Sequence, residues 1–443
     1  MLRRLMFGVT IWLVATITYG DDWPQWLGPE RDAVWRETGV VSQIPPDGLR
    51  VKWRISVQHG YSGPAVAKGR VYLMDYAPTS GKVVNNPGGA AKLEGKERVL
   101  CFDANTGAEL WKHEYEQPYN ISYPGGPRST PTVVDGKVYT LGAEGHLSCL
   151  RADTGKLVWE KSLTEVYATQ TPIWGYASHP FVVGNLLYIL AGGDGTVCVA
   201  LNKDTGEQVW AALSAPEPGY GTPALISHAG KEQLLVWIPE TLNSLNPATG
   251  EVFWSVPLKP GFGMSIMAPR KIGNHVYCSA IGDVSALVRL DDQQPAAEIA
   301  WQGTPKSSIY CSNGTPFLDG DMIYGCDIET GALMGARLQD GERLWQTTQP
   351  MTTQPTSGSE RRSRHATAFI VKNADRYFLF GEQGDLIIAQ LSPEGYHEVG
   401  RFHVLEPTNE AFGRKVVWSH PAFAQRSLFA RNDEELVCVD LAE

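Results

Sequence analysis

The residues with the clearest chemical potential in this 443-residue chain stand just before a recurring proline. Three positions before most copies of it comes an aromatic, arginine or amide side chain, and three histidines stand one or two positions before it. With Trp174 from an adjoining loop, the set is Tyr61, Arg128, Trp174, His179, Tyr220, Asn313, Arg364, His365, Trp418 and His420. Gathered at one place, aromatic rings, guanidinium groups and imidazoles would form a pocket for an anionic or planar ligand. The same side chains could instead bond to one another and fill the space, and both interpretations stay open.

Other chemistries fit these residues less well. A metal site built from His179, His365 and His420 is disfavoured, because the three belong to different repeats and no carboxylate shares their motif. Ser178 and Ser419 each precede a histidine, but adjacent residues of a strand point to opposite faces, so neither serine meets its neighbour as a base. The sequence also has no nucleophile elbow. We therefore predict no catalytic and no metal-binding residues.

The elements that must position these residues form a repeat. A turn of the type Thr106-Gly107 is followed by Trp111, and the same phrase returns along the chain. From Trp111 through Trp345, successive tryptophans are 48, 51, 44, 47 and 44 residues apart. Periods of this length are typical of propellers and solenoids. Because residues on the same outer strand of nearly every repeat cannot converge on one site, we predict that the tryptophans pack between neighbouring repeats.

Each repeat reads as four short strands. In the second repeat, the expected strands are 130–134, 137–143, 146–151 and 157–163, rich in Val, Leu and Tyr. Asp135-Gly136 between the first two is a strong signal for a tight hairpin. The connections are too short for helices, so the pattern predicts an all-β fold.

Counting first strands gives eight repeats. The proline that marks them, replaced once by threonine, occurs as Pro64, Pro131, Pro180, Pro223, Pro269, Pro316, Thr367 and Pro421. The eighth repeat lacks a fourth strand, and residues 49–57 around Trp53 can supply it. We therefore predict an eight-bladed β-propeller of four-stranded antiparallel blades over residues 49–443, closed by an N-terminal strand that completes the C-terminal blade. With the first strand innermost, the residues before the proline ring the axial mouth.

The N-terminal residues predict export. Arg3 and Arg4 precede an apolar run, 5–17, that is too short for a comfortable membrane span, and small residues follow, so residues 1–20 read as a signal peptide. Residues 21–48 form an irregular lead-in rich in Trp and Pro, whose tryptophans are expected to dock on folded structure. We expect a periplasmic or other extracytoplasmic protein, with membrane association only if the signal segment stays uncleaved.

Charge and cysteine content exclude further classes. The net charge of −10 becomes −12 when residues 1–20, with two arginines and no acid, are removed. Such an acidic chain is a poor binder of nucleic acid or anionic membrane, which require a basic face. The seven cysteines form no C-x-x-C motif. They are expected to be small buried strand residues, with Cys311 and Cys326 as the one pair worth testing for a disulfide.

These repeats resemble the pyrroloquinoline-quinone-like (PQQ-like) propeller repeats of quinoprotein alcohol dehydrogenases and of BamB-like exported propellers. The resemblance rests on Val-Tyr…Leu-x-Ala/Asp…Thr-Gly-x-x-x-Trp over nearly all of residues 50–443, and on the opening Trp-Pro-Gln-Trp-Leu-Gly-Pro-Glu-Arg-Asp at 23–32. The resemblance to the dehydrogenases implies a disulfide between adjacent cysteines and a Glu/Asn/Asp set that binds calcium. This chain has no adjacent cysteines, and we cannot match the calcium set. The lipid-bearing cysteine of the BamB-like lipoproteins is also missing.

Two functions follow from the resemblance. We expect a non-catalytic binding or scaffold module that presents its axial mouth to an envelope polypeptide or saccharide, with no cofactor. The alternative is a PQQ- and calcium-dependent quinoprotein oxidoreductase acting on an alcohol or sugar. In the mouth, Arg128 and Arg364 are expected to attract the ligand, and Tyr61, Tyr220 and Trp418 to supply stacking area.

Two further expectations concern charge at the mouth. His365 and His420 are expected to gain charge as the pH falls through about 6.5. Replacing both mouth arginines with alanine is expected to weaken binding and to leave folding nearly intact.

Overall fold

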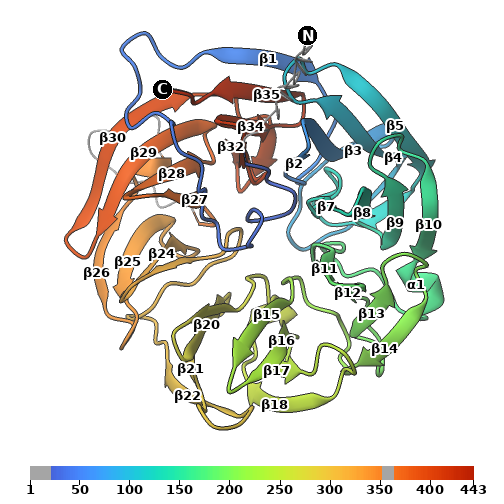
Figure 1. Cartoon of the computed structure of the whole chain (residues 1–443), viewed down its shortest axis with the longest axis vertical. Coiled ribbons are helices and arrows are strands. Elements are labelled where there is room, and N and C mark those ends of the chain that lie inside the picture. The colour runs from blue at the N-terminus through green and yellow to red at the C-terminus, as the bar shows by residue number, and fades with distance from the viewer. Residues whose placement is uncertain (1–20, 352–363) are drawn as a thin grey trace, which may run out of the picture.

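Four-stranded antiparallel sheets recur eight times around a central axis in residues 21–351 and 364–443, which are the residues that this computed structural model describes (Figure 1). The first strand of each blade lies beside the axis. The predicted all-β, eight-bladed propeller is confirmed. The predicted signal peptide, residues 1–20, lies outside the described residues.

Blades 1 to 4 follow the chain, and their strands run from the axis outward. Blade 1 has β2 (Ala65–Ala67), β3 (Arg70–Ser80), β4 (Ala91–Asp103) and β5 (Glu109–Glu116), with β6 (Tyr119–Ile121) paired to β4; blade 2 has β7 (Thr132–Val134), β8 (Lys137–Leu141), β9 (His146–Arg151) and β10 (Leu157–Ser162), followed by helix α1 (Leu163–Val166). Blade 3 has β11 (Phe181–Val183), β12 (Leu186–Leu190), β13 (Cys198–Asn202) and β14 (Gln208–Ala212); blade 4 has β15 (Ala224–His228), β16 (Lys231–Trp237), β17 (Thr241–Leu245) and β18 (Val252–Pro257), followed by the 3-10 turn η1 (Gly261–Gly263).

Blades 5 to 8 repeat the plan. Blade 5 has β19 (Arg270–Ile272), β20 (His275–Ala280), β21 (Val284–Leu290) and β22 (Ala297–Gln302); blade 6 has β23 (Phe317–Asp319), β24 (Met322–Asp327), β25 (Ala332–Arg337) and β26 (Arg343–Thr347), followed by η2 (Gln349–Met351). Blade 7 has β27 (Ala368–Asn373), β28 (Arg376–Gly381), β29 (Asp385–Ser392) and β30 (Gly395–His403); a hairpin of β31 (Asn409–Ala411) and β32 (Arg414–Val416) leads to blade 8, with β33 (Ala422–Ala424), β34 (Ser427–Arg431), β35 (Glu435–Asp440) and β1 (Val51–Ser56).

Tight turns explain why consecutive strands pair. Asp135 and Gly136 both have left-handed backbone, with φ of 50° and 74°. This is the conformation that a two-residue Asp-Gly hairpin requires, and Val134 pairs with Lys137 across it. We predicted that the recurring proline lies within the inner strand. It instead lies directly before that strand, because proline has no N–H to donate to a strand ladder.

The repeated tryptophans pack between neighbouring blades, as predicted. The indole N–H of Trp111 in blade 1 donates to the carbonyl of Ala152 in blade 2 at 3.1 Å, and Trp159 and Trp210 make equivalent bonds to the blades that follow them. The turn glycine of the next blade lies against the indole ring. A Cβ atom on Gly155 would come within 2.4 Å of Trp111, and Gly155 also has φ of +70°. The Gly-x-x-x-Trp spacing therefore encodes contact between successive blades.

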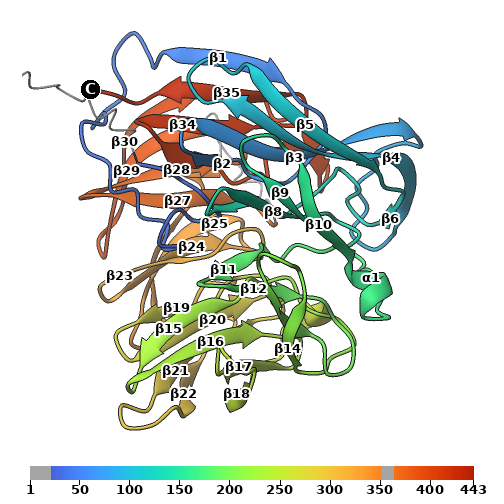
Figure 2. The ribbon, with the colours of Figure 1, turned by 45° about the vertical axis from the view of Figure 1, so that its right-hand side comes forward.

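The ring closes by pairing an N-terminal strand with a C-terminal strand, as predicted. β1 pairs antiparallel with β35, and Figure 2 shows the two strands side by side. The indole N–H of Trp53 on β1 donates to the carbonyl of Ala104 in blade 1 at 3.0 Å. The fully buried Arg431 of blade 8 donates to the carbonyls of Met74 and Gln58. Blade 8 is thereby bonded to blade 1 both through β1 and through a buried arginine.

The lead-in crosses the axis inside the ring (Figure 1). Trp23 exchanges two backbone hydrogen bonds of 2.8 Å with Val66 of blade 1. Arg270 of blade 5 donates to the carbonyl of Arg31 at 2.7 Å. The tryptophans of the lead-in are at most 5% exposed, so the expectation that they dock on folded structure is confirmed.

Blade 1 departs from the repeat. β3 and β4 have 11 and 13 residues, against five and six in β8 and β9. β6 pairs with the extra length of β4, and both reach past the neighbouring strands in Figure 2. We call the connection between β3 and β4, residues 81–90, the strap. In the described part of the chain, no helix has the length and apolar character needed to cross a membrane.

Candidate functional site

The connections between blades converge on one face of the ring around a cavity of about 840 Å³, which we call the mouth. All ten residues selected from the sequence line it, because each enters an innermost strand from the same face or lies in a connection beside one. That they bind a ligand stays a prediction. Lining residues outside that selection include Trp26, Tyr123, Phe262, Ser312, Thr315, Glu329 and Phe412.

Trp26 of the lead-in forms the inner end of the mouth. Its ring stacks on His179, with 4.6 Å between centroids, and meets His420 edge-on at 5.8 Å. Beneath Trp26 remains a space of about 20 Å³, which has room for about one water molecule. The mouth is therefore a bowl whose inner end is closed by the lead-in. The side chains selected from the sequence line this bowl and do not fill the part that opens to solvent.

The three histidines of the mouth are uncharged near neutral pH. His179 Nδ1 accepts the backbone N–H of Thr130 at 2.8 Å, which leaves the ring proton on Nε2. Burial lowers the pKa of His179 well below 6.5 and lowers the pKa of His365 to about 4 and of His420 to about 3. His365 also stacks on Phe412 with 4.4 Å between centroids. The expectation that His365 and His420 gain charge near pH 6.5 is therefore wrong.

We expect these histidines to make the fold sensitive to acid. Their pKa values are below 6.5 in the folded state and return to about 6.5 on unfolding, so the unfolded chain binds more protons between those limits. The stabilisation is complete above about pH 6.5, and the free energy of unfolding should fall as the pH drops from there toward 4. Urea denaturation at several pH values across this window measures the slope.

His420→Asn is the control for this prediction, because asparagine cannot take up the proton. The variant should show a shallower decrease than the wild type over the same window. A wild-type free energy of unfolding that stays constant from about pH 6.5 to about pH 5, above the range of most carboxylates, would contradict the assignment.

Arg128 is engaged by its own loop. Its guanidinium donates to the carbonyls of Ser122 at 2.8 Å and Tyr123 at 2.7 Å, and also to that of Gly126. It lies 5.3 Å from the centre of the Tyr61 ring. Burial lowers its pKa. Arg128 therefore holds the loop that enters blade 2, and both of its terminal guanidinium nitrogens already donate to backbone carbonyls.

The other arginines at the mouth have carboxylate partners. Arg364 binds both oxygens of Glu329, at 2.7 and 2.5 Å, near the rim. Behind the wall, Arg414 binds both oxygens of the buried Glu382, at 2.8 and 3.0 Å. The indole N–H of Trp418 donates to the same carboxylate at 3.2 Å, which fixes the ring that faces the mouth. The expected cationic attraction is thus largely neutralised within the protein.

Several rings at the mouth are presented by left-handed backbone. Tyr123, Phe262, His365 and Phe412 have φ of 51°, 57°, 61° and 51°. Bulky L-residues rarely adopt this conformation, and where they do, the surrounding structure enforces it, often at functional sites. Phe262 is 80% exposed and Phe412 is 46% exposed, so folding alone gains little from placing these rings there.

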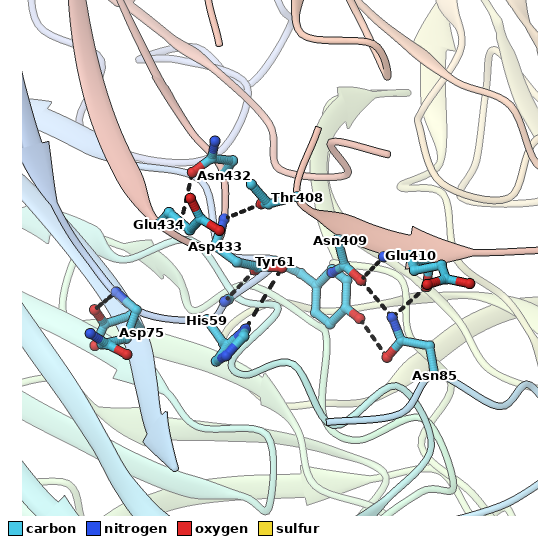
Figure 3. A network of polar contacts seen from close by, with 12 residues as sticks. His59, Tyr61, Asp75, Asn85, Thr408, Asn409, Glu410, Asn432, Asp433 and Glu434 are labelled. Atoms are coloured by element: carbon cyan, nitrogen blue, oxygen red, sulfur yellow. Dashed lines mark hydrogen bonds and ion pairs between the residues drawn. The ribbon is translucent and has the colours of Figure 1, made fainter. Parts of the chain in front are cut away.

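The strap borders the mouth. Asn85 accepts a hydrogen bond from the Tyr61 hydroxyl at 3.2 Å and donates to the Asn409 side chain (Figure 3). The carbonyl of Pro87 accepts the indole N–H of Trp174 at 3.1 Å. The strap thus connects the hairpin before blade 8 with the loop before blade 3, and it holds Tyr61 and Trp174 in place.

The mouth does not fit pyrroloquinoline quinone with calcium. Calcium takes about six to eight oxygen ligands, whereas the carboxylate lining the mouth, Glu329, is engaged by Arg364. Within residues 21–351 and 364–443, no three His, Cys, Asp or Glu side chains are grouped so that they could hold a metal. The seven cysteines are buried free thiols, Cys311 and Cys326 among them.

Comparison with known proteins gives two kinds of relative. The family model described as outer membrane protein assembly factor BamB matches residues 95–347 and 194–443, which together cover most of the chain. Outer membrane protein assembly factor BamB of Burkholderia pseudomallei is 30% identical over 163 residues, covering 36% of this chain and 37% of that protein. Quinoprotein alcohol dehydrogenase PedH of Pseudomonas putida is 30% identical over 118 residues, covering 26% of this chain and 19% of that protein. The chain thus spans less than two fifths of either relative.

Among solved structures, BamB from Moraxella catarrhalis superposes with a TM-score of 0.57. The match covers 88% of this chain and 97% of that one at 14% sequence identity. At this identity the likeness shows the shared propeller fold alone.

Proposed function

The chain belongs to the family described as outer membrane protein assembly factor BamB, and from that premise we propose that it is an exported, non-catalytic propeller that binds an envelope polypeptide or saccharide in its mouth. The predicted signal peptide and the outer-membrane names of its relatives support an extracytoplasmic location. The acidic net charge of −10 argues against nucleic acid as the partner.

The observation that carries this proposal is the exposed aromatic lining of the mouth. Phe262 and Phe412 project from strained backbone on two different blade connections, and Trp174 and Trp418 are held by hydrogen bonds that their indole N–H groups donate. Rigid aromatic side chains in a concave site provide much of the binding energy in ligand pockets and interfaces. Among the described residues of this lining, we identify no acid–base pair beside a nucleophile, and binding without chemistry is the function that this lining supports best.

A comparison of matched variants tests the binding role. Phe262→Ser with Phe412→Ser should leave the melting temperature nearly unchanged, since both rings are exposed, and should abolish capture of an envelope component that the wild type retains. Val209→Ser, on the exposed outer strand β14, is the control and should retain that component. Equal capture by the double variant and the wild type would refute binding at the mouth.

The quinoprotein alternative has its own test. The purified protein is mixed with pyrroloquinoline quinone and calcium, and dye reduction is followed over a panel of alcohols and sugars. We expect no turnover above background, because the described residues of the mouth offer no set of donors for calcium and the sequence has no adjacent cysteines. Turnover that the double Phe variant loses would establish the alternative.

A further inference from the structure

We propose that the mouth binds the end of an uncharged oligosaccharide, an inference that rests on the proposed binding role and names its ligand class. Three features of the bowl carry it: neutralised charge, aromatic rings, and a row of polar groups that the protein itself leaves unpaired.

The charge of the bowl excludes an ionic ligand as the best fit. Arg364 and Glu329 neutralise each other at the rim, and the Arg128 guanidinium is occupied by loop carbonyls. His365 and His420 are neutral at ordinary pH. An anionic ligand would also meet the field of a chain with net charge −10. An uncharged ligand meets no electrostatic repulsion in this environment.

Two parts of the bowl, the connections that enter blades 2 and 6, offer hydrogen-bonding groups without internal partners. Within the described residues, the hydroxyl groups of Ser312, Thr315 and Tyr123 form no hydrogen bond, although all three line the mouth. The Asn313 side chain donates its amide N–H to the carbonyl of His365 at 3.0 Å and keeps its oxygen free. Ser312, Asn313 and Thr315 lie together in the connection that enters blade 6. They form a short row of donors and acceptors suited to the hydroxyl groups of a sugar.

The aromatic groups complete this chemistry. A pyranose ring has hydroxyl groups around its edge and an apolar C–H face that packs on aromatic rings. Phe412 and Phe262 are exposed for such packing, and Trp418 and Trp174, which also line the mouth, are held by hydrogen bonds. An apolar ligand would leave the polar row unpaired, which is costly in a recessed site. A sugar satisfies both surfaces.

The shape of the bowl favours a chain end over a chain interior. Trp26 closes the axis beneath His179 and His420, and the cavity below it measures about 20 Å³. A ligand therefore enters and leaves by the same opening. A polypeptide lying extended in the mouth would need partners for its backbone N–H and C=O groups, and the mouth is built from loops instead of an unpaired strand edge.

The test is isothermal titration of the purified protein with maltohexaose, cellohexaose, xylohexaose and chitohexaose. Hexagalacturonate serves as the acidic counterpart, and an acetylated, amidated aromatic-rich peptide as the polypeptide probe. We expect at least one neutral hexasaccharide to bind more tightly than hexagalacturonate. Ser312→Ala with Thr315→Val should weaken that binding at least about tenfold, or about 1.4 kcal/mol. These hydroxyls have no internal partner, so the melting temperature should not change.

Ser56→Ala is the matched control and should bind as the wild type does, because this serine on β1 is exposed and its side chain forms no hydrogen bond within the described part of the chain. Binding of no neutral hexasaccharide overturns the inference, as does binding that the double variant leaves unchanged. If the peptide alone binds and binding requires Phe412, the saccharide inference fails and the mouth proposal survives. If no probe depends on Phe412 and partners attach to the outer strands, the proposed function fails as well.

Discussion

A chain that begins at Gln58, without the lead-in and β1, is expected to lose cooperative folding altogether. It would leave the outer edge of β35 unpaired and remove Trp53 from the junction of blades 8 and 1. It would also remove the buried Trp23, Trp26 and Trp35 from the inside of the ring. Burial of each such side chain contributes roughly 1.5–3 kcal/mol to stability. Losing several of them removes a large part of the roughly 5–15 kcal/mol that stabilises a typical domain.

Thermal and urea unfolding, followed by circular dichroism, measure this effect. The control lacks only residues 1–20 and retains all contacts among the described residues, so it should unfold in one sharp transition. A truncated chain with a sharp transition at the same midpoint as the control would show that the ring closes without its N-terminal strand.

Arg128→Met is expected to lower the free energy of unfolding by at least about 3 kcal/mol. The substitution leaves the carbonyls of Ser122, Tyr123 and Gly126 without their donor, and each buried unsatisfied group costs roughly 1–3 kcal/mol. The sequence alone predicted that folding would tolerate loss of this arginine, and the loop contacts revise that expectation. Urea denaturation provides the measurement.

Arg364→Ala is the matched control for Arg128. Its ion pair with Glu329 is largely exposed, and such pairs contribute roughly 0–1 kcal/mol. Equal destabilisation by the two substitutions would mean that Arg128 does not hold the loop. Loss of ligand binding by Arg128→Met without loss of stability would return it to the role of a ligand contact.

The fold could be predicted from the sequence because its signals are local and repeated. Gly155 and Trp111 belong to two copies of one phrase, and their contact across blades repeats around the ring. Asp135-Gly136 fixes a hairpin by backbone preference alone. The missing fourth strand of the last blade and the spare strand around Trp53 predicted closure, since the ends of a ring must meet.

The location of the mouth could be predicted for the same reason, but the contacts and pKa values of its side chains could not. Counting back from the recurring proline selects nine of the ten residues by register, which is why they line one cavity together with Trp174 from an adjoining loop. Register does not reveal partners, so the engagement of Arg128 by loop carbonyls and the low pKa of His420 could not be anticipated. The lead-in was expected to dock somewhere, but a segment without periodicity does not show where, and Trp26 as the floor was missed.

The strap was also missed, although the sequence contains a signal for it. Equivalent positions in the second and third strands, Val71 and Cys101, are 30 residues apart in blade 1, whereas Val138 and Cys149 are 11 residues apart in blade 2. That difference reveals an insertion, but it does not show that Asn85 reaches across to the hairpin before blade 8. Long-range contacts of this kind depend on the closed ring.

Site-specific photo-crosslinking in cells tests most directly the central claim that the protein works through its mouth. A photoreactive phenylalanine analogue replaces Phe262 or Phe412 in the mouth and, separately, Val209 or Val252 on the exposed outer strands β14 and β18. We predict ligand adducts from the two mouth positions and none from the outer strands. Adducts from Val209 and Val252 alone would contradict the account and place the binding surface on the blade edges.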